Sequence, residues 1–408
     1  MTDRTNPPID LDGTLTAWLE RTAPDREPEQ LLGRILETTA VTRRRPTWWG
    51  PGGHVAGLGR PQLLARPSLG IVALVGLLML AIAMALAAGS RPQVPLPLGR
   101  SGWIVAAHDG ETLLLGRSGS VEHRLSTGGM FGAAAWSPDG SRLARAAGTP
   151  DDPVLLITDA DLADVVRVVL PPNTVPWFSW SPDGRRITFG TETETMARVY
   201  VVETAARAVP VPITGLAINA LAPSWSPDGM WIAFRGGVAL DEQALWVMHP
   251  DGSGVRRLSQ QGRAVAPWCG FPWLPDGRSL LFGTAYNGVW VVDVDGTKER
   301  QIIGGSEQAY CPSISPDGTR VAAMVWQDTG KYIVVANLDG THRVTPPAPL
   351  YDDWPAVWSP DGRSLVMNGR DLRGGPNPRA FLDPNGVEPA RVFFLDDAAV
   401  LGWQRLAP

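Results

Sequence analysis

A single pentapeptide recurs along the chain at nearly constant spacing. The motif Trp-Ser-Pro-Asp-Gly occupies residues 136–140, 180–184, 225–229 and 358–362, and altered copies lie at 273–277 and 314–318. The steps between successive first residues are 44, 45, 48, 41 and 44 residues, and Trp403 follows 45 residues after Trp358 without the rest of the motif. A period of about 40–50 residues with a turn signal in each repeat is typical of a β-propeller, which has one four-stranded blade per repeat.

The motif predicts the innermost strand of a blade and the hairpin that follows it. Small or apolar residues precede each Trp, which would fill the space between neighbouring blades. In the turn, Pro sets φ near −65°, Asp hydrogen-bonds its own backbone and Gly accepts a positive φ. An alternating second strand follows, as at 186–189, and later a third strand with a second hairpin, as at 245–248 with Asp251-Gly252. The repeated Asp is therefore interpreted as a turn residue. The repeats that begin at 136 and 180 lack the second Asp-Gly, so their outer strands are less well defined.

The two ends of the repeat region predict seven blades. Strand-like segments at 103–107, 112–115 and 121–125 precede the first motif and lack an inner strand, whereas residues 398–404 form an inner strand without outer ones. Joining them makes a seventh blade that both ends of the chain close, which removes the open edges of the ring. Six blades with additional edge strands is the alternative.

An uncharged apolar segment, residues 69–88, precedes the repeats. It is long enough to span a bilayer, and no charged residue lies between Arg66 and Arg91. Five Arg and no acid lie in residues 41–67, so the positive-inside bias places the N-terminus in the cytoplasm and the repeats outside. A signal-peptidase site at 85–87 is the alternative. However, the N-terminal stretch before the apolar segment, and the apolar segment itself, are both long for a signal peptide. We therefore expect a single-pass protein of the cell membrane with a retained signal anchor.

Four regions follow from these patterns. Residues 1–67 form a cytoplasmic tail, 68–90 a transmembrane helix, 91–100 a Pro-rich linker and 101–408 the propeller. Leu11, Leu15, Trp18 and Leu19 have helical spacing in the tail, and a second short amphipathic helix begins near Pro28. Two such helices bury little core alone, so they dock on a partner or lie against the membrane.

Charge argues against nucleic acid as a partner. Residues 1–67 carry 9 Arg and 8 acidic residues, a net charge of +1, and the remainder carries 27 basic and 33 acidic residues, a net charge of −6. A basic patch would be needed for binding to phosphates, and the predicted ectodomain is acidic.

Cys269 and Cys311 are the only cysteines, and they occupy equivalent positions in consecutive repeats, four and three residues before the first motif residue. A disulfide between adjacent blades is one reading, in an oxidising compartment. Two buried free thiols is the other.

No catalytic or metal-binding constellation is visible. The chain has no Gly-x-Ser-x-Gly elbow and no phosphate-binding glycine loop, and its five His are scattered without metal-ligand spacing. We therefore assign no catalytic residue, no metal and no cofactor. An enzyme is not excluded, because a propeller can assemble a site from distant loops.

Aromatic and acidic residues in the loops that lead into the inner strands are the candidate ligand-binding residues. These are Trp177, Trp268, Tyr310, Asp352, Asp353 and Trp354. Such a mixture could hold a peptide, a glycan or a basic protein patch. The structural alternative is that the aromatic residues pack between blades and cap the channel.

The Trp-Ser-Pro-Asp-Gly repeats resemble those of TolB-type propellers, a WD-like family of bacterial envelope proteins, over residues 100–408. The resemblance implies a protein-binding role outside the cytoplasm and no established catalysis. The chain departs from that family in its predicted membrane anchor and in lacking a separate globular domain before the propeller. Its layout is also similar to that of membrane-bound anti-sigma factors, although the tail has no cysteine and so lacks the zinc-binding motif of many of them.

Three functions remain. The first is a membrane-anchored binding or sensing module, whose propeller meets an envelope protein, a peptide or a glycan. The second is a transmembrane regulator, similar to an anti-sigma factor, whose tail binds a cytoplasmic partner. The third is an envelope enzyme that acts on glycans or peptides.

Overall fold

The computed structural model describes residues 99–406 apart from 109, 128–132, 160, 216–217, 239–242, 262, 267–268, 285–287, 305–307, 328–329, 347–354, 369–377 and 395–398. The chain divides into two units, Met1–Ile82 and Ala83–Pro408, and every described residue belongs to the second. The predicted tail, the predicted membrane segment and residues 91–98 of the linker lie outside the described residues. In the part of the chain that is described, no helix is long and apolar enough to cross a membrane.

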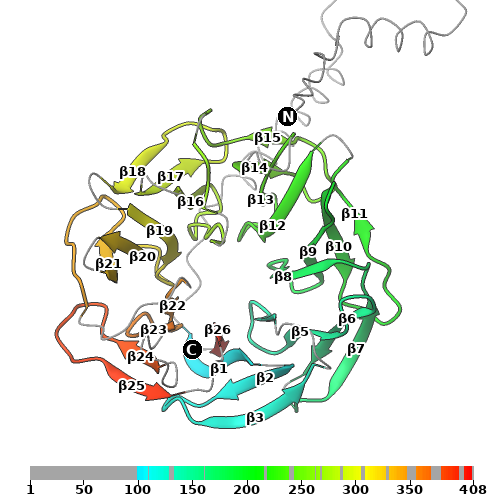
Figure 1. Ribbon diagram of the computed structural model, residues 1–408, viewed down its shortest axis with the longest axis horizontal. Coiled ribbons are helices and arrows are strands. Elements are labelled where there is room, and N and C mark those ends of the chain that lie inside the picture. The colour runs from blue at the N-terminus through cyan, green and yellow to red at the C-terminus, as the bar shows by residue number, and fades with distance from the viewer. Residues whose placement is uncertain are drawn as a thin grey trace, which may run out of the picture. The chain divides into compact units, whose positions relative to one another are not determined.

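Seven antiparallel sheets surround a central axis (Figure 1). Blade 1 combines β26 (Ala399–Leu406), β1 (Arg100–His108), β2 (Glu111–Leu115) and β3 (Val121–Ser126). Blade 2 consists of β4 (Ala134–Trp136), β5 (Leu143–Gly148), β6 (Pro153–Thr158) and β7 (Asp164–Val169). Blade 3 consists of β8 (Thr174–Trp180), β9 (Arg186–Glu192), β10 (Ala197–Glu203) and β11 (Val211–Pro212).

The remaining four blades continue the same order around the ring. Blade 4 consists of β12 (Asn219–Trp225), β13 (Ile232–Gly237), β14 (Ala244–Met248) and β15 (Arg256–Arg257). Blade 5 consists of β16 (Ser279–Thr284), β17 (Gly288–Asp293) and β18 (Arg300–Ile303), and blade 6 of β19 (Gln308–Ile314), β20 (Arg320–Gln327) and β21 (Gly330–Asn337). Blade 7 consists of β22 (Val357–Trp358), β23 (Leu365–Asn368), β24 (Pro378–Leu382) and β25 (Arg391–Phe394). The prediction of seven blades is confirmed, and six is excluded.

Each motif forms the hairpin between the first and second strands of a blade. In blade 3 the Gly184 N–H donates to the Ser181 carbonyl (2.8 Å), and Asp183 accepts hydrogen bonds from the Ser181 hydroxyl (2.5 Å) and the Arg185 N–H (3.0 Å). These hydrogen bonds lower the pKa of the Asp183 carboxyl. Gly184 has φ +68°, a conformation that side chains disfavour. The interpretation of the motif Asp as a turn residue is confirmed.

The motif Trp links neighbouring blades. The Trp180 indole N–H of blade 3 donates to the Ala135 carbonyl of blade 2 (2.9 Å), and its ring belongs to a core cluster with Ala144 and Leu155 of that blade. The Arg142 guanidinium of blade 2 lies over the Trp180 ring (5.1 Å to the centroid) and donates to the Gly184 carbonyl (2.5 Å). Arg320 repeats both contacts between blades 6 and 7, on Trp358 and Gly362.

The first and last strands of the propeller close the ring by pairing with each other. Ile104 of β1 lies opposite Trp403 of β26, and Arg100 lies opposite Leu406. The Gln404 side chain then connects three segments: its amide oxygen accepts from the Trp103 N–H (3.0 Å) and its amide nitrogen donates to the Gly140 carbonyl of blade 2 (2.8 Å).

Two further contacts hold β26 in the ring. The side chain of Asn368, the last residue of β23 in blade 7, exchanges hydrogen bonds with the Val400 N–H (2.8 Å) and carbonyl (3.3 Å). On the other side, a Cβ at Gly140 would lie 1.8 Å from the Arg405 carbonyl oxygen, so blade 2 can approach β26 only with glycine at this position. Blade 1 is therefore the blade predicted from the two chain ends.

Blade 5 differs from the prediction, because the segment before Trp273 forms no regular inner strand among the described residues. Val265 and Trp273 make only isolated bridges, to Thr284 and Leu280. The outer strand of blade 6 is likewise reduced to a single bridge, from Val335 to Val344. Blades 2 and 3, whose outer strands the sequence defined less well, do have them, as β7 and β11.

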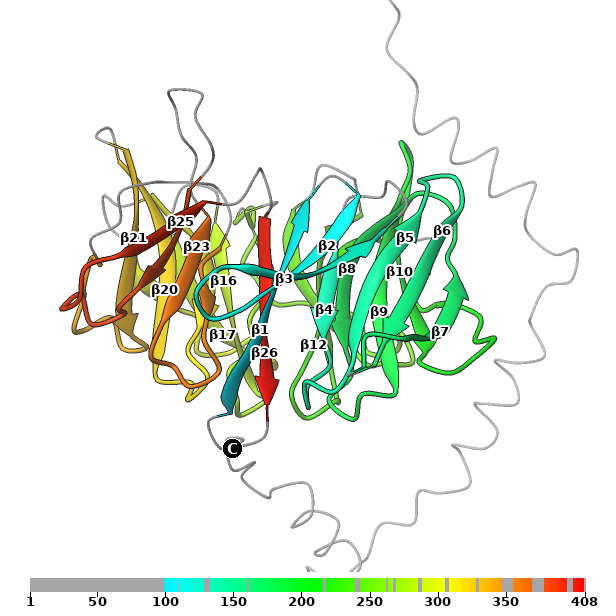
Figure 2. The ribbon, with the colours of Figure 1, turned by 90° about the horizontal axis from the view of Figure 1, so that it is seen from below.

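The ring has two faces, seen edge-on in Figure 2. We call lower face the one with the motif hairpins and upper face the opposite one, where loops lead into the inner strands and join the second strand to the third. Gly140 in a motif hairpin contacts Arg405 near the end of β26, so β1 begins and β26 ends at the lower face.

Replacing Gln404 by Ala should weaken closure of the ring. The side chain is buried, and its loss leaves the Trp103 N–H and the Gly140 carbonyl without partners, which should lower the free energy of unfolding by about 2 kcal/mol or more. Thermal unfolding of the full chain in detergent measures the effect, with the exposed Gln260→Ala as the matched control. Equal melting temperatures for the two variants would show that Gln404 does not support closure.

Candidate binding face of the propeller

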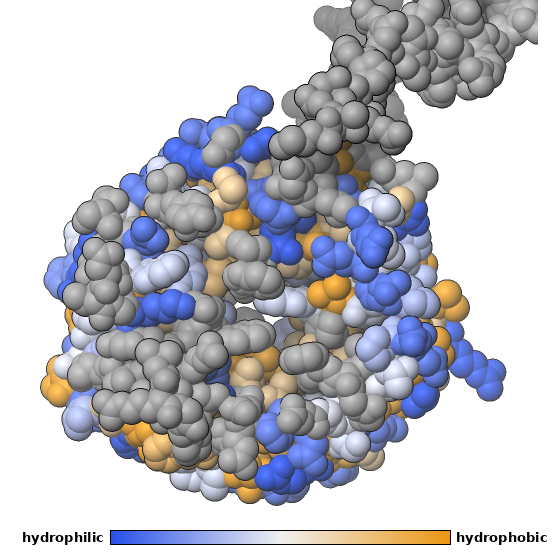
Figure 3. All heavy atoms as spheres, viewed as in Figure 1, coloured by the Kyte–Doolittle hydropathy of each residue, from blue (hydrophilic) through white to orange (hydrophobic). Residues whose placement is uncertain are grey.

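The upper face is hollowed at the centre of the ring, and apolar residues are visible on part of the rim of this hollow (Figure 3). The blades below it are a rigid support, because the second strand of each is almost wholly buried between its neighbours. Phe189, Phe234 and Phe282, one in each of three consecutive blades, are fully buried. Groups held at the upper ends of these strands are therefore positioned by the packed core.

Two of the predicted ligand-binding residues lie in the described part of the chain. Trp177 is half-buried in β8, next to a bulge between Val175 and Ser179. Tyr310 is half-buried in β19 and packs against the core cluster between blades 6 and 7. Two blades lie between β8 and β19, so these two residues belong to separate parts of the ring. Trp268, Asp352, Asp353 and Trp354 lie outside the described residues, and their role stays a prediction.

Not every aromatic residue before a motif is available for binding. Phe271 precedes Trp273 by two residues and is only 2% exposed, because it packs in the core cluster between blades 4 and 5. For this residue the packing interpretation holds. Exposure therefore has to be established for each aromatic side chain of the face.

Two inner strands carry strained backbone at the same place. Ala222 in β12 and Cys311 in β19 each lie three residues before the first motif position and have positive φ values of 50° and 48°. Both fall in bulges, between Leu221 and Ser224 and between Tyr310 and Ser313. A β-bulge bends its strand and changes the direction in which the neighbouring side chains point. These two bulges therefore set the direction of β12 and β19 near the upper face.

A disulfide joins Cys269 to Cys311, with 4.6 Å between their Cα atoms. It connects the irregular inner segment of blade 5 to β19 of blade 6. Both cysteines are buried, 2% and 1% exposed, in the core cluster that also contains Trp358. The bridge thus ties the least regular inner segment of the ring to its neighbour.

One charged pair lies near the upper ends of blades 3 and 4. Burial lowers the pKa of Arg235 on β13, and the carboxylate of Glu192 at the end of β9 opposes this shift. Glu192 is exposed and Arg235 is half-buried. Among the described residues, no group of three or more His, Cys, Asp or Glu is placed to hold a metal ion.

Sequence reasoning missed Trp326. This residue lies near the upper end of β20, is 53% exposed, and has the Lys331 ammonium 5.6 Å from its ring centroid. Five apolar, buried residues, 321–325, precede it in the strand. The available signal was the change in the sequence from the apolar residues 321–325 to the polar Gln327 and Asp328 directly after Trp326.

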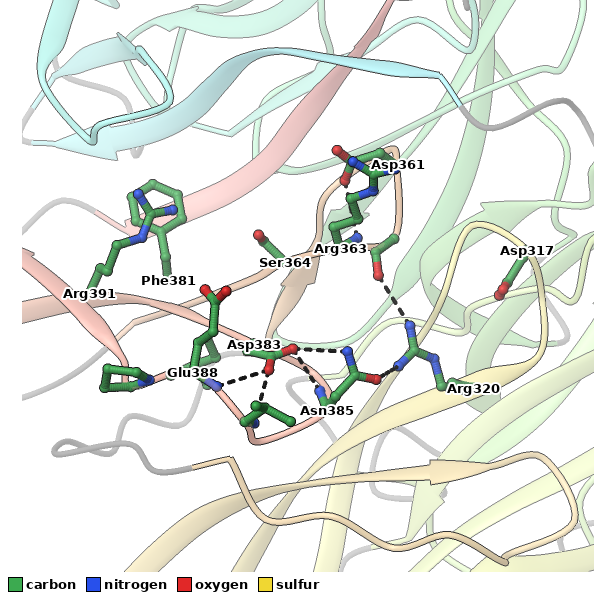
Figure 4. A pocket seen from close by; sticks show the side chains of 14 residues that line it. Asp317, Arg320, Asp361, Arg363, Ser364, Phe381, Asp383, Asn385, Glu388 and Arg391 are labelled. Carbon is green, nitrogen blue, oxygen red and sulfur yellow. Dashed lines mark hydrogen bonds between the residues drawn. The ribbon is translucent and has the colours of Figure 1, made fainter.

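The lower face has a groove of about 590 Å³ between the hairpins of blades 6 and 7 (Figure 4). It is lined by Asp317, Arg320, Asp361, Gly362, Arg363, Ser364, Phe381, Leu382, Asp383, Asn385, Val387, Glu388, Pro389 and Arg391. Several of its charged groups serve the hairpins themselves. Arg320 donates to the Gly362 carbonyl and to the Asn385 side chain (both 3.1 Å).

The Asp383 carboxylate in this groove is likewise engaged. It accepts the backbone N–H groups of Asn385 (2.9 Å), Val387 (2.9 Å) and Glu388 (3.0 Å). Partial burial raises the pKa of Asp383, but these hydrogen bonds outweigh it, so the pKa is lowered. The charged groups Arg320 and Asp383 of this groove therefore stabilise the hairpins that form it. For this reason we favour the upper face as the binding surface.

Comparison with known proteins gives the fold. No protein-family model and no curated protein matches the chain. Among solved structures, TolB from Acinetobacter baumannii is 18% identical over 65% of this chain and 67% of its own, with a TM-score of 0.47. Dihydro-heme d1 dehydrogenase NirN in complex with DHE is 16% identical over 78% of this chain and 77% of its own, with a TM-score of 0.51. Oligogalacturonate lyase from Vibrio parahaemolyticus is 12% identical over 69% of this chain and 86% of its own, with a TM-score of 0.51.

These likenesses show the propeller fold alone. Membership of the TolB-type family stays a prediction. Two of the three similar proteins have the names of enzymes, and the fold therefore does not decide between binding and catalysis.

The disulfide can be tested by alkylation without reductant followed by intact-mass measurement. We expect no added label on the unfolded, unreduced chain and two labels after reduction; two labels without reduction would contradict the bridge. Because 42 residues separate the cysteines, the Cys269→Ala/Cys311→Ala double variant should lose up to about 4 kcal/mol of stability on the loop-entropy model.

Proposed function

We propose that the protein is a membrane-anchored module whose propeller binds or senses an extracytoplasmic ligand at its upper face. Residues 69–88 would anchor it, with the N-terminus in the cytoplasm and the propeller outside. The ligand would be an envelope protein, a peptide or a glycan. No catalytic group is assigned.

The observation that carries this proposal is the place where the propeller begins. Arg100, the first residue of β1, lies opposite Leu406 at the lower face, and a Cβ at Gly99 would meet the Leu406 carbonyl oxygen at 2.7 Å. A tether that ends at residue 99 therefore joins the propeller at its lower face. The upper face, where Trp326 is exposed, lies on the side of the propeller opposite this attachment point and would be the face that meets a ligand.

The disulfide supports the proposed compartment. Structural disulfides persist where the environment is oxidising and are rare in the reducing cytosol. A bridge between Cys269 and Cys311 fits a propeller outside the cytoplasm, as the distribution of Arg around residues 69–88 also does.

The orientation has a direct test in reporter fusions. Alkaline phosphatase needs disulfides to fold, so it is active only outside the cytoplasm. Fused after Pro408 it should be active, and fused after residue 67 it should be inactive. The reverse pattern would place the propeller in the cytoplasm and overturn the proposal, and release of the active fusion from membranes by alkaline carbonate would show that residues 69–88 do not anchor it.

A further inference from the structure

Three charged side chains of the lower-face groove take no part in the hairpins that form it. Arg363, Glu388 and Arg391 all line the groove and are exposed. In the described part of the chain, none of the three forms an ion pair or a side-chain hydrogen bond. The Arg391 guanidinium lies over the Phe381 ring, 5.2 Å from its centroid, and this contact leaves its N–H groups free to donate. Two cationic groups and one carboxylate are therefore available to a ligand.

The other carboxylates of the groove are already hydrogen-bonded within the turns. Asp317, Asp361 and Asp383 each accept hydrogen bonds from hydroxyl or backbone N–H groups of their own hairpins. Because these donors hold the three carboxylates in the turns, they do not pair with the two free Arg side chains. An anionic group that enters the groove would therefore meet guanidinium groups without a competing partner.

A small residue lies between the two cationic side chains. Figure 4 shows Ser364 with Arg391 on one side and Arg363 on the other. Ser364 is six residues after Trp358, a position that Arg occupies at three other blade junctions, where its long side chain crosses to the next blade. The Ser side chain is too short to cross, and its hydroxyl has no hydrogen-bond partner among the described residues. The groove therefore stays open at this point and has a third donor there.

The free groups of the groove suit a ligand that has an anionic and a cationic part. Arg binds phosphate oxygens through charge-assisted hydrogen bonds, and a hydroxyl group can donate a further one. The free carboxylate of Glu388 would pair with an ammonium group. Figure 4 shows Glu388 on the same side of the groove as Arg391, so the two parts of the ligand would lie close together. A phosphate joined to a primary ammonium by a short bridge has this chemistry, and it is the head group of a zwitterionic phospholipid.

The place of the groove argues for a lipid as the source of such a group. The groove lies at the lower face in blade 7, where the Phe381 ring is 5.9 Å from the Trp403 ring of blade 1. The proposed tether would join blade 1 at the same face, and the ten residues 89–98 span about 35 Å at most when extended. Val387 also lines the groove and is 82% exposed, so an apolar side chain would meet the acyl chains beside the head group.

We propose that the lower-face groove binds the head group of a membrane phospholipid that carries a phosphate and a primary ammonium. Arg363, Arg391 and the Ser364 hydroxyl would donate to the phosphate, and Glu388 would pair with the ammonium. The contact would hold the lower face on the bilayer and turn the upper face toward its ligand. This inference rests on the proposed function, because the tether is what brings the lower face to a membrane.

The test uses the full chain in dodecyl maltoside micelles and two phospholipids with the same acyl chains. Phosphatidylethanolamine has the ammonium group, and phosphatidylglycerol has the phosphate without it. Titration read by native mass spectrometry should show tighter binding of phosphatidylethanolamine. Arg363→Gln should weaken binding of both lipids by about tenfold, because it removes a charge-assisted contact to the phosphate. Glu388→Gln should remove only the preference for phosphatidylethanolamine.

Arg185→Gln is the matched control, because Arg185 is exposed and holds the equivalent position in the blade 3 hairpin, five residues after the motif Trp. It should bind both lipids as the unaltered chain does, and equal melting temperatures for the variants exclude effects on folding. Equal weakening by Arg185→Gln and Arg363→Gln would show that the charge of the lower face, and not the groove, holds the lipid. That result would overturn the inference, as would unchanged binding by Arg363→Gln or equal binding of the two lipids by the unaltered chain.

A soluble probe separates a lipid from a free head group as the source. Glycerophosphoethanolamine has the same phosphate and ammonium groups without acyl chains. We expect it to displace phosphatidylethanolamine only at concentrations about tenfold higher or more, because it lacks the apolar contact. Displacement at equal concentration would show that the groove takes a soluble ligand, and the proposed contact with the bilayer would be wrong.

The two proposals fail separately. If the phosphatase fusions reverse while phosphatidylethanolamine binding still depends on Arg363, the proposed function is wrong and the head-group site stands. If the fusions behave as expected and lipid binding does not depend on Arg363, the site is wrong and the anchored binding module still stands.

Discussion

The pairing of β26 with β1 is the contact on which the propeller depends, because it converts a row of seven sheets into a closed ring. Two residues from the first and last strands of the propeller, Trp103 and Gln404, are joined there by a hydrogen bond of 3.0 Å, and Gln404 also donates to the Gly140 carbonyl of the next blade. Ring closure leaves the last blade no free side, so each blade packs against two neighbours. The rigid support under the upper face follows from that closure.

Between the other blades, the motif supplies a repeated connection. At three blade junctions, an Arg two residues after one motif lies over the Trp of the next: Arg142 on Trp180, Arg186 on Trp225 and Arg320 on Trp358. Arg142 and Arg320 also donate to the carbonyl of that motif's Gly. Blade 5 departs from this pattern. Its motif has Leu274 in place of Ser, so the hydroxyl that supports the other turns is missing, and its inner segment makes only isolated bridges. The Cys269–Cys311 disulfide connects this segment to blade 6, where the repeated contacts resume.

The fold could be predicted well from the sequence because the motif depends on local interactions. A turn that needs Pro, Asp and Gly in this order can be recognised in each repeat, and the spacing of the repeats predicts the number of blades. The site was less predictable, because exposure depends on packing between blades. Phe271 and Trp326 are both large aromatic residues near the ends of strands, yet one is 2% and the other 53% exposed. The spacing of the motifs does separate Trp177 from Tyr310 by two repeats, and the structure has two blades between them.

We propose that the propeller, rather than the tail, carries the binding function. Crosslinking the full-length protein in its native membranes, followed by pull-down and mass spectrometry, tests it most directly. We expect envelope proteins or glycan-linked species to be crosslinked to the propeller, at residues of the upper face, and no specific partner to be crosslinked to residues 1–67. A sigma factor or another soluble regulator crosslinked within residues 1–67, with nothing on the propeller, would contradict it and make the protein a transmembrane regulator.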